Sequence, residues 1–247
     1  MLLVIVEGVS GAYLPSLRAS HDISGGLSMP RLDRIAQGGL RYTNFVAHQR
    51  RTSRGLYAAL CGDLPNLLRG TPKMTAYAHA GGRPCLPQRL REAGYRTAFV
   101  QAAPLAFMLK DQFMPLVGFD EVYGHDWFPD AYVRSVWGID DRSYFEQSLE
   151  MVDRLQESGQ PWFLTMLSVG THHPTILPQN FERHKPIRFS RAVSYADQAF
   201  DGFVRGLRER GVFDDTLVII TSDESRGISA RRDEVTAALT QSWGFLV

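Results

Sequence analysis

The residues best suited to chemistry follow apolar runs of the chain. One run, "LLVIV", ends at Glu7, and another, "TLVIITS", ends at the adjacent carboxylates Asp223 and Glu224. Three carboxylates buried together would repel one another and raise their own pKa values unless a cation lay between them. Hard divalent cations prefer oxygen ligands of this kind. The residues therefore favour a metal site formed by Glu7, Asp223 and Glu224, although each one alone is also typical of a turn or a helix cap.

Thr52 brings a hydroxyl group to the start of a predicted helix, "SRGLYAALCG". It is suited to cap that helix, but a second role has chemical content. Free N–H groups at a helix N-terminus stabilise an attached phosphate, and a bound cation lowers the pKa of a hydroxyl and makes it a nucleophile. Arg50, Arg51 and Arg54 are able to hold anionic oxygens nearby, although arginines of this kind are also typical of a solvated surface.

Two histidines and a lysine–aspartate pair add further polar groups. His172 and His173 follow the apolar run "WFLTMLSV" in the loop "GTHHP", where two adjacent histidines are suited to general acid–base chemistry or to phosphate contact. Lys110 and Asp111 follow the run "RTAFVQAA" after a short interval. A lone loop histidine has no function in most proteins, so the position of these groups relative to the others decides their meaning.

The elements that position these residues alternate between strand-like and helix-like patterns. Continuous branched apolar runs predict buried strands, and apolar positions at helical spacing that end on glycine predict helices. Strands are expected at 2–6, 40–47, 96–103, 161–169, 216–222 and 243–247, helices at 29–39, 53–62, 85–95, 140–158, 190–211 and 233–242, and mostly irregular chain at 104–140. This alternation predicts an α/β fold, a mostly parallel sheet with helices on both faces, in one domain over 1–247.

In such a sheet, ligands bind beyond the carboxyl ends of the strands. Five expected strands lead at that end to polar groups. Four of them lead to Glu7, Lys110, His172 and Asp223, and the fifth leads to the segment before Thr52. Ordinary surface turns do not require so many side chains that are able to bind a metal or take part in catalysis. The sequence therefore predicts that one edge of the sheet holds a metal-dependent site.

Composition excludes some classes of function. The chain has 247 residues, 44% apolar and 21% charged, which is typical of a soluble globular protein. A net charge of +1 gives no argument for a nucleic-acid partner. No run of 18 apolar residues predicts a transmembrane helix, and "MLLVIVEG" lacks the charged start and cleavage site of a signal peptide. Cys61 and Cys85 are compatible with one disulfide or with two buried thiols.

Taken together, the segments resemble the lipoteichoic acid synthase and phosphoglycerol transferase branch of the alkaline phosphatase–sulfatase superfamily, along essentially the whole chain. "VIVEG" is similar to the family's first strand with its metal-binding acid, and "RRTSRGLYAALCG" is similar to its nucleophile segment. The most specific stretch, "LREAGYRTAFVQAAPLAFMLKDQFMPLVGFDEVYG", resembles a strand followed by the family's substrate loop. "WGIDDRSYF", "PWFLTMLSVGTHHP" and "TLVIITSD" complete the series in the family order.

The resemblance implies catalytic and metal-binding roles. Thr52 would be a metal-bound nucleophile, and His172 would contact the transferred group. Glu7, Thr52, Asp223 and Glu224 would hold one divalent cation. The family usually has histidine where this chain has Glu224, and glutamate adds negative charge, which shifts the preference from Zn²⁺ toward Mn²⁺ or Mg²⁺. We expect Mn²⁺ to be the preferred cation.

The resemblance also implies a substrate class. Lys110 stands where the family has a basic residue that contacts substrate, and Asp111, His173 and Arg54 are expected to bind substrate beside it. The implied reaction is double displacement: the nucleophile attacks the phosphorus of a phospholipid such as phosphatidylglycerol, diacylglycerol leaves, and a glycan or polymer hydroxyl then takes the phosphoglycerol.

"THHP" and "LCGDLP" are closer to the Gram-negative, glucan-modifying type than to the Gram-positive polymerases. That preference implies a periplasmic domain, in which Cys61 and Cys85 could be joined. Family members are normally anchored by N-terminal membrane helices. We therefore expect 1–247 to be a catalytic domain excised from, or truncated relative to, an inner-membrane protein.

Two alternatives stay open at this point. One is a related enzyme, either a phosphoethanolamine transferase or a hydrolase such as a phosphodiesterase, phosphatase or sulfatase. The segment "TSRGL" lacks the C/S-x-P-x-R pattern of sulfatase nucleophiles, which is an argument against the last of these. The other alternative is an inactive sensor domain that binds lipid head groups or glycan, for which Glu224 is the only support in the sequence.

Overall fold

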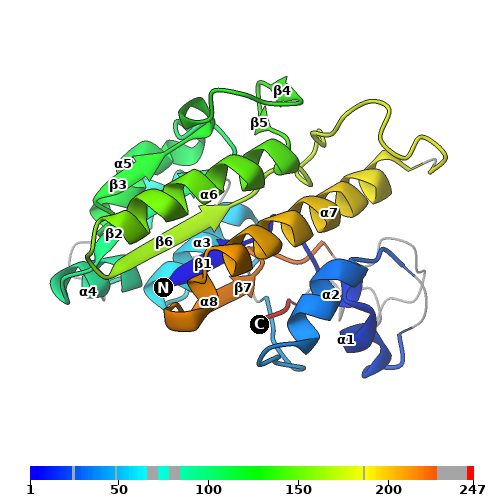
Figure 1. Cartoon of the computed structure of the whole chain (residues 1–247), viewed down its shortest axis with the longest axis horizontal. Helices are drawn as coiled ribbons and strands as arrows, with labels where there is room; N and C mark the ends of the chain where they lie inside the picture. Colours follow the sequence, from blue (N-terminus) through cyan, green and yellow to red (C-terminus); the bar gives the residue numbers. More distant parts are fainter. Residues whose placement is uncertain (24–25, 48, 66–71, 78–83, 186, 227–243) are drawn as a thin grey trace.

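A computed structural model of the 247-residue chain describes all residues except 24–25, 48, 66–71, 78–83, 186 and 227–243. In the described part, five strands form a parallel sheet in the order β3-β2-β6-β1-β7 (Figure 1). They are β1 (Leu2–Ile5), β2 (Arg96–Gln101), β3 (Glu121–Tyr123), β6 (Trp162–Leu167) and β7 (Val218–Thr221). In β1, Ile5 pairs with Leu167 on one side and Thr221 on the other. The chain therefore leaves β1, β6 and β7 at the same edge.

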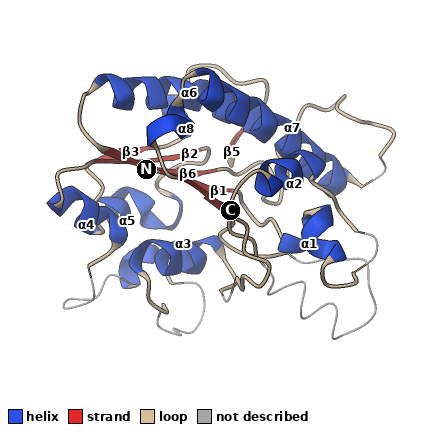
Figure 2. Cartoon of the chain, turned by 60° about the horizontal axis from the view of Figure 1, so that its bottom comes forward, coloured by secondary structure: helices blue, strands red, loops and turns tan. Residues whose placement is uncertain are grey.

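Helices cover both faces of this sheet (Figure 2). One face carries α6 (Asp141–Glu157), α7 (Arg188–Glu209) and α8 (Val212–Asp215), and the other carries α3 (Thr52–Cys61), α4 (Leu86–Glu92) and α5 (Lys110–Leu116). Side chains of β1 alternate between them: Leu2 and Val4 join the apolar cluster under α6 and α7, and Leu3 and Ile5 join the cluster under α3 and α5. A strand buried on both faces must be apolar throughout, which explains the continuous run.

Shorter elements complete the described fold. Helix α2 (Pro30–Gln37) lies beside α7, where its Leu32 N–H donates to Asp197 at 2.9 Å, and α1 (Pro15–Ala19) lies next to α2. Strands β4 (Arg134–Ser135) and β5 (Gly138–Ile139) form a small antiparallel hairpin. The described residues also form short 3₁₀ helices, which are η1 (Gly11–Tyr13), η2 (Met74–Ala76), η3 (Phe107–Leu109) and η4 (His125–Trp127). No helix in the described residues is long and apolar enough to cross a bilayer.

The predicted fold class is confirmed, and most of the long elements lie where the apolar patterns predict them. The strand expected at 40–47 is wrong. That segment forms isolated bridges and no strand, one bridge being between Tyr42 and Leu246, and Val46 is 57% exposed. The edge beside β7 is taken instead by the end of the chain, because Ile220 and Val247 exchange both backbone hydrogen bonds. The strand expected at 243–247 is correspondingly reduced to this short antiparallel pairing.

The segment 104–140 is more ordered than expected, since it contains α5, β3, β4 and β5. Its elements are short and α5 includes Pro115, so no helical period develops. The helix expected at 233–242 lies outside the described residues. A disulfide joins Cys61, the last residue of α3, to Cys85, which precedes α4.

Candidate active site

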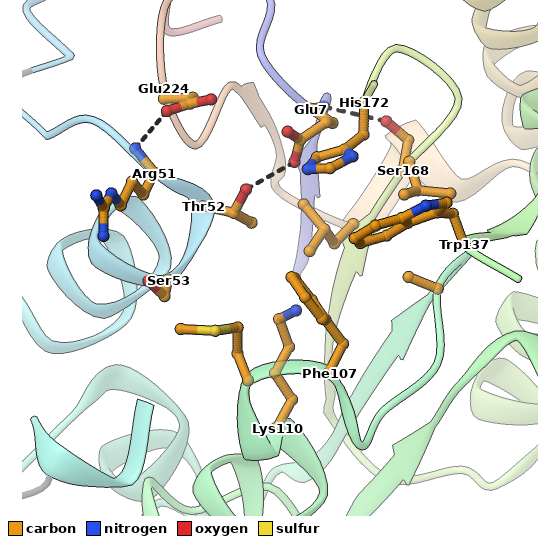
Figure 3. Close-up of a pocket in the computed structure, with 14 residues that line it drawn as sticks. Glu7, Arg51, Thr52, Ser53, Phe107, Lys110, Trp137, Ser168, His172 and Glu224 are labelled. Atoms are coloured by element: carbon orange, nitrogen blue, oxygen red, sulfur yellow. Dashed lines mark hydrogen bonds between the residues drawn. The ribbon is translucent and has the colours of Figure 1, made fainter. Parts of the chain in front are cut away.

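Thr52 is the first residue of α3, and its hydroxyl does not cap the helix. It donates to Glu7 Oε2 at 3.0 Å (Figure 3). The cap position belongs to Arg51, which makes no side-chain cap and has φ of 82°. A non-glycine residue in that left-handed region costs on the order of 1–3 kcal/mol and is found mainly at functional sites. The helix start is therefore shaped to present the Thr52 hydroxyl to Glu7.

Gly55 allows α3 to lie directly against the loop that follows β7. A Cβ added at Gly55 would stand 1.7 Å from the carbonyl oxygen of Asp223, so only glycine permits this approach. On the other side of the loop, Asp223 Oδ1 accepts the Gly8 N–H at 2.8 Å. These two contacts fix Asp223 between the start of α3 and the end of β1.

Glu7 and Asp223 are almost completely buried, with 2% and 4% of their surface exposed. Burial raises the pKa of Glu7, and burial together with the charge of Glu7 raises the pKa of Asp223 well above its usual range. Glu7 Oε1 and Asp223 Oδ2 have no hydrogen-bond partner among the described residues. Two orphaned carboxylate oxygens beside a hydroxyl are a set of hard donors that fits a divalent cation.

Glu224 is directed elsewhere in this structure. Its Oε2 accepts the backbone N–H of Arg51 in a short hydrogen bond (Figure 3). Burial, followed by the charge of Asp223, raises the pKa of Glu224. In the part of the chain that is described, no group of three Asp, Glu, His or Cys side chains stands in a metal-binding arrangement. The donors that converge are thus two carboxylates and the Thr52 hydroxyl.

Lys110 is the first residue of α5 and is 3% exposed. Burial lowers the pKa of Lys110 to about 8, even though the charges of Glu7 and Asp223 act in the opposite direction. Its Nζ lies 5.3 Å from the centre of the Phe107 ring. The ammonium group therefore titrates close to neutral pH in a position that is shielded from water.

His172 follows β6 and stacks on Trp137, with ring centroids 5.0 Å apart. Burial, and next the positive charge of Arg226, lowers the pKa of His172. Its Nδ1 is buried and has no hydrogen-bond partner among the described residues. A neutral imidazole with an open nitrogen is suited to accept a proton.

These side chains meet in a cavity of about 230 Å³ at the carboxyl edge of the sheet (Figure 3). Its lining is Glu7, Arg51, Thr52, Ser53, Ala103, Phe107, Met108, Lys110, Trp137, Leu167, Ser168, Val169, His172 and Glu224. Of the residues proposed from sequence, five line the cavity and Asp223 lies beside Glu7. Arg54, Asp111 and His173 are not part of the lining, and the last two are exposed.

Several residues of the site were not found from sequence. Ser168 Oγ accepts the Glu7 N–H at 3.1 Å, and the Thr171 hydroxyl donates to the Glu7 carbonyl, so the loop after β6 holds Glu7 in place. Arg226 Nη2 stands 4.0 Å from Glu7 Oε1. Ser168 directly follows β6, but it lies inside the strand expected at 161–169, so the strand-end rule did not select it. No sequence signal marks Trp137, which comes from an irregular segment.

Comparison with known proteins finds curated relatives of this chain. The chain is 28% identical over 208 residues to phosphoglycerol transferase I of Escherichia coli strain E24377A, a match that covers 78% of the chain and 27% of the relative. Phosphoglycerol transferase I of Shigella boydii matches to the same extent. The chain thus spans about a quarter of the length of these curated relatives.

Solved structures share the fold. A protein in the alkaline phosphatase superfamily from Vibrio parahaemolyticus superposes with a TM-score of 0.81 at 22% identity, over 100% of this chain and 59% of that one. The lipoteichoic acid synthase LtaP from Listeria monocytogenes gives 0.80 at 20%, over 100% and 64%. The C-terminal periplasmic domain of EptC from Escherichia coli, in complex with zinc, gives 0.67 at 15%, over 99% and 71%.

The sequence profile of one family, described as Sulfatase, matches residues 1–242. That match extends from the strand that bears Glu7 through the loop that bears Asp223 and Glu224. Because it covers nearly all of the 247 residues, the chain belongs to the sulfatase family.

Proposed function

We propose that this chain is the catalytic domain of a metal-dependent phosphoglycerol transferase. The observation that carries the proposal is the hydrogen bond from the Thr52 hydroxyl to Glu7, made at the start of a helix and inside a cavity that also holds Lys110. A hydroxyl in that position is suited to attack a phosphorus atom. The relatives named phosphoglycerol transferase I support this reaction over others of the family.

Glu7, Asp223 and Thr52 are the proposed ligands of one divalent cation. Glu224 becomes a further ligand if its carboxylate turns away from the Arg51 N–H. When bound, the cation would lower the pKa of the Thr52 hydroxyl and offset negative charge on the phosphoryl oxygens. A donor set made only of oxygens favours Mn²⁺ or Mg²⁺ over Zn²⁺, and we propose Mn²⁺.

The proposed reaction has two balanced steps. In the first, a bond forms between Thr52 Oγ1 and phosphorus and the bond from phosphorus to the diacylglycerol oxygen breaks, so that Thr52 loses a proton and diacylglycerol gains one. In the second, a bond forms between the acceptor oxygen and phosphorus, the bond from phosphorus to Thr52 Oγ1 breaks, and the acceptor's proton passes to Thr52. His172 and Lys110 face the cavity and are suited to carry that proton.

The proposed partners follow from this chemistry. The donor is a phospholipid such as phosphatidylglycerol, and the acceptor is a hydroxyl of a glycan or polyol. The proposed location is extracytoplasmic, which the Cys61–Cys85 disulfide supports because such bonds persist in oxidising compartments. Arg54, Asp111 and His173 are proposed to contact substrate outside the cavity lining.

The test uses the 247-residue chain with Mn²⁺ and a fluorescent phosphatidylglycerol. Diacylglycerol release is compared between wild type, Thr52→Ala and the control Thr216→Ala, whose hydroxyl bonds Asp215 near the opposite end of β7. We expect release that needs metal and Thr52 and that the control variant retains. Release that persists at the wild-type rate in Thr52→Ala would contradict the proposal.

Added acceptors then identify the reaction. A soluble glucan that becomes labelled with phosphoglycerol supports transfer, whereas free glycerol phosphate as the only product would indicate a hydrolase. A donor with an ethanolamine head group, offered in parallel, tests the phosphoethanolamine alternative. If no diacylglycerol is released from any donor with Mn²⁺, Mg²⁺ or Zn²⁺, the inactive sensor domain would be favoured.

A further inference from the structure

The mouth of the active-site cavity has an apolar side and a basic side. Phe107 and Trp137 line the cavity with ring centroids 5.2 Å apart, and Phe107 is 41% exposed. Val136, which precedes Trp137 in the turn between β4 and β5, is 87% exposed. We call Phe107, Val136 and Trp137 the apolar rim. Figure 3 shows Arg51 on the other side of the cavity, and the exposed Arg50 comes directly before it.

Trp137 is half-buried and packs against the apolar cluster under α6 and α7, but folding does not explain the exposure of Val136. Val136 has the largest exposed fraction of any large apolar residue in the described part of the chain, and it joins neither main apolar cluster. Tight turns between strands favour Gly, Asn or Asp, so the turn itself does not call for valine. A single exposed apolar residue is ordinary. Two exposed apolar side chains, Phe107 and Val136, that flank the half-buried Trp137 beside a cavity, one through its ring contact and the other in sequence, are typical of a contact surface.

We propose that the apolar rim, together with Arg50, docks this chain on the surface of an anionic phospholipid bilayer. Aromatic side chains favour the interfacial layer of a membrane, and arginines near the surface are attracted to negatively charged lipids. The apolar rim is thus complementary to the interfacial layer of such a membrane, and Arg50 is complementary to its negative charge. The inference rests on the proposed function for its purpose, because a donor held in a bilayer can enter the cavity only if the mouth faces it.

Vesicle binding measures this docking without any turnover. The chain is sedimented with vesicles of phosphatidylcholine alone, or of phosphatidylcholine with phosphatidylglycerol, in the presence of a chelator. We expect binding to the anionic vesicles that weakens with added salt, and that falls about tenfold in Val136→Asp, since burial of one valine side chain is lost. Removing one surface charge in Arg50→Gln should weaken binding about fivefold.

Leu217→Asp is the matched control. Leu217 is 63% exposed, and its carbonyl accepts the Leu2 N–H at the amino end of the strands, away from the cavity. The control should bind like wild type, and thermal unfolding should show that all variants are folded. Equal binding by wild type and Val136→Asp, or an equal loss in Leu217→Asp, would overturn the proposal.

The design separates the docking from the reaction. A chain that releases diacylglycerol from a soluble short-chain donor but binds no anionic vesicle overturns the docking and leaves the transferase standing. A chain that binds vesicles through the apolar rim but acts on no donor overturns the transferase and supports the docking.

Discussion

Replacing Lys110 with methionine should stabilise the fold and abolish activity. The lysine is 3% exposed, and burial lowers its pKa from 10.5 to about 8. At about 1.36 kcal/mol for each pH unit, that difference means that holding the charged side chain in the fold costs about 3 kcal/mol. Methionine fills a similar volume without the charge, so Lys110→Met should be about 3 kcal/mol more stable than wild type at pH 7.

The direction of the Lys110 pKa shift determines how the free energy of unfolding changes with pH. Because the pKa of Lys110 is lower in the folded chain, the unfolded chain binds more protons between about pH 8 and 10.5. The stability of wild type should therefore rise with pH across this window, and the advantage of Lys110→Met should shrink toward zero at its upper end.

Urea unfolding at several pH values, in a chelator, measures both quantities. Lys73→Met, which changes an exposed lysine, is the control and should differ little from wild type at any pH. If Lys110→Met is less stable than wild type at pH 7, or if its advantage does not change between pH 8 and 10.5, the burial of a costly charge is refuted.

Three further predictions concern stability and metal preference. Reducing the Cys61–Cys85 disulfide, which closes a loop with a sequence separation of 24, should lower the free energy of unfolding by about 3 kcal/mol, and urea titrations with and without reductant check this. Burial raises the pKa of Asp141 from 3.8 to about 7, so the folded chain binds the extra proton and wild-type stability should fall as pH rises from 4 to 7. The buried Glu7, Asp223 and Glu224 act in the same direction, so Asp141→Asn should show a smaller fall, and the same slope in both proteins would contradict it. Glu224→His replaces an oxygen donor by nitrogen and should raise the affinity for Zn²⁺ relative to Mn²⁺ about tenfold by calorimetry, and an unchanged ratio would show that Glu224 is not a ligand.

The parts of the fold that sequence predicts are those buried on both sides. Strands β1, β6 and β7 lie where apolar runs predict them, because a strand between two layers of helices buries side chains on both faces and is mostly apolar, with Thr165 and Thr221 as polar exceptions. The run at 40–47 includes the polar residues Arg41, Thr43 and Asn44, and it makes isolated contacts instead, such as the bridge between Tyr42 and Leu246. The pattern of side chains indicates whether a segment favours a strand, but it does not identify the strand with which that segment would pair. The prediction of a strand at 40–47 was therefore wrong.

The site divides in the same way. Glu7 and Asp223 could be brought together because the carboxyl ends of parallel strands meet at one edge, and their positions follow from topology. Thr52 reaches them from the start of α3, although the strand expected before it at 40–47 is absent. Whether a side chain such as Asp111, at the start of α5, or His173, in the loop after β6, points into that site depends on local backbone direction, which no period in the sequence encodes. The same reason hides Trp137, which reaches the cavity from the turn between β4 and β5.

Intact mass spectrometry after a brief reaction with phosphatidylglycerol and Mn²⁺ tests the central claim most directly. The proposal predicts a species heavier than the chain by one phosphoglycerol group, mapped by peptide analysis to Thr52 and absent in Thr52→Ala. A wild-type chain that releases diacylglycerol at full rate and never carries this group, or carries it on another residue, would contradict the role given to Thr52.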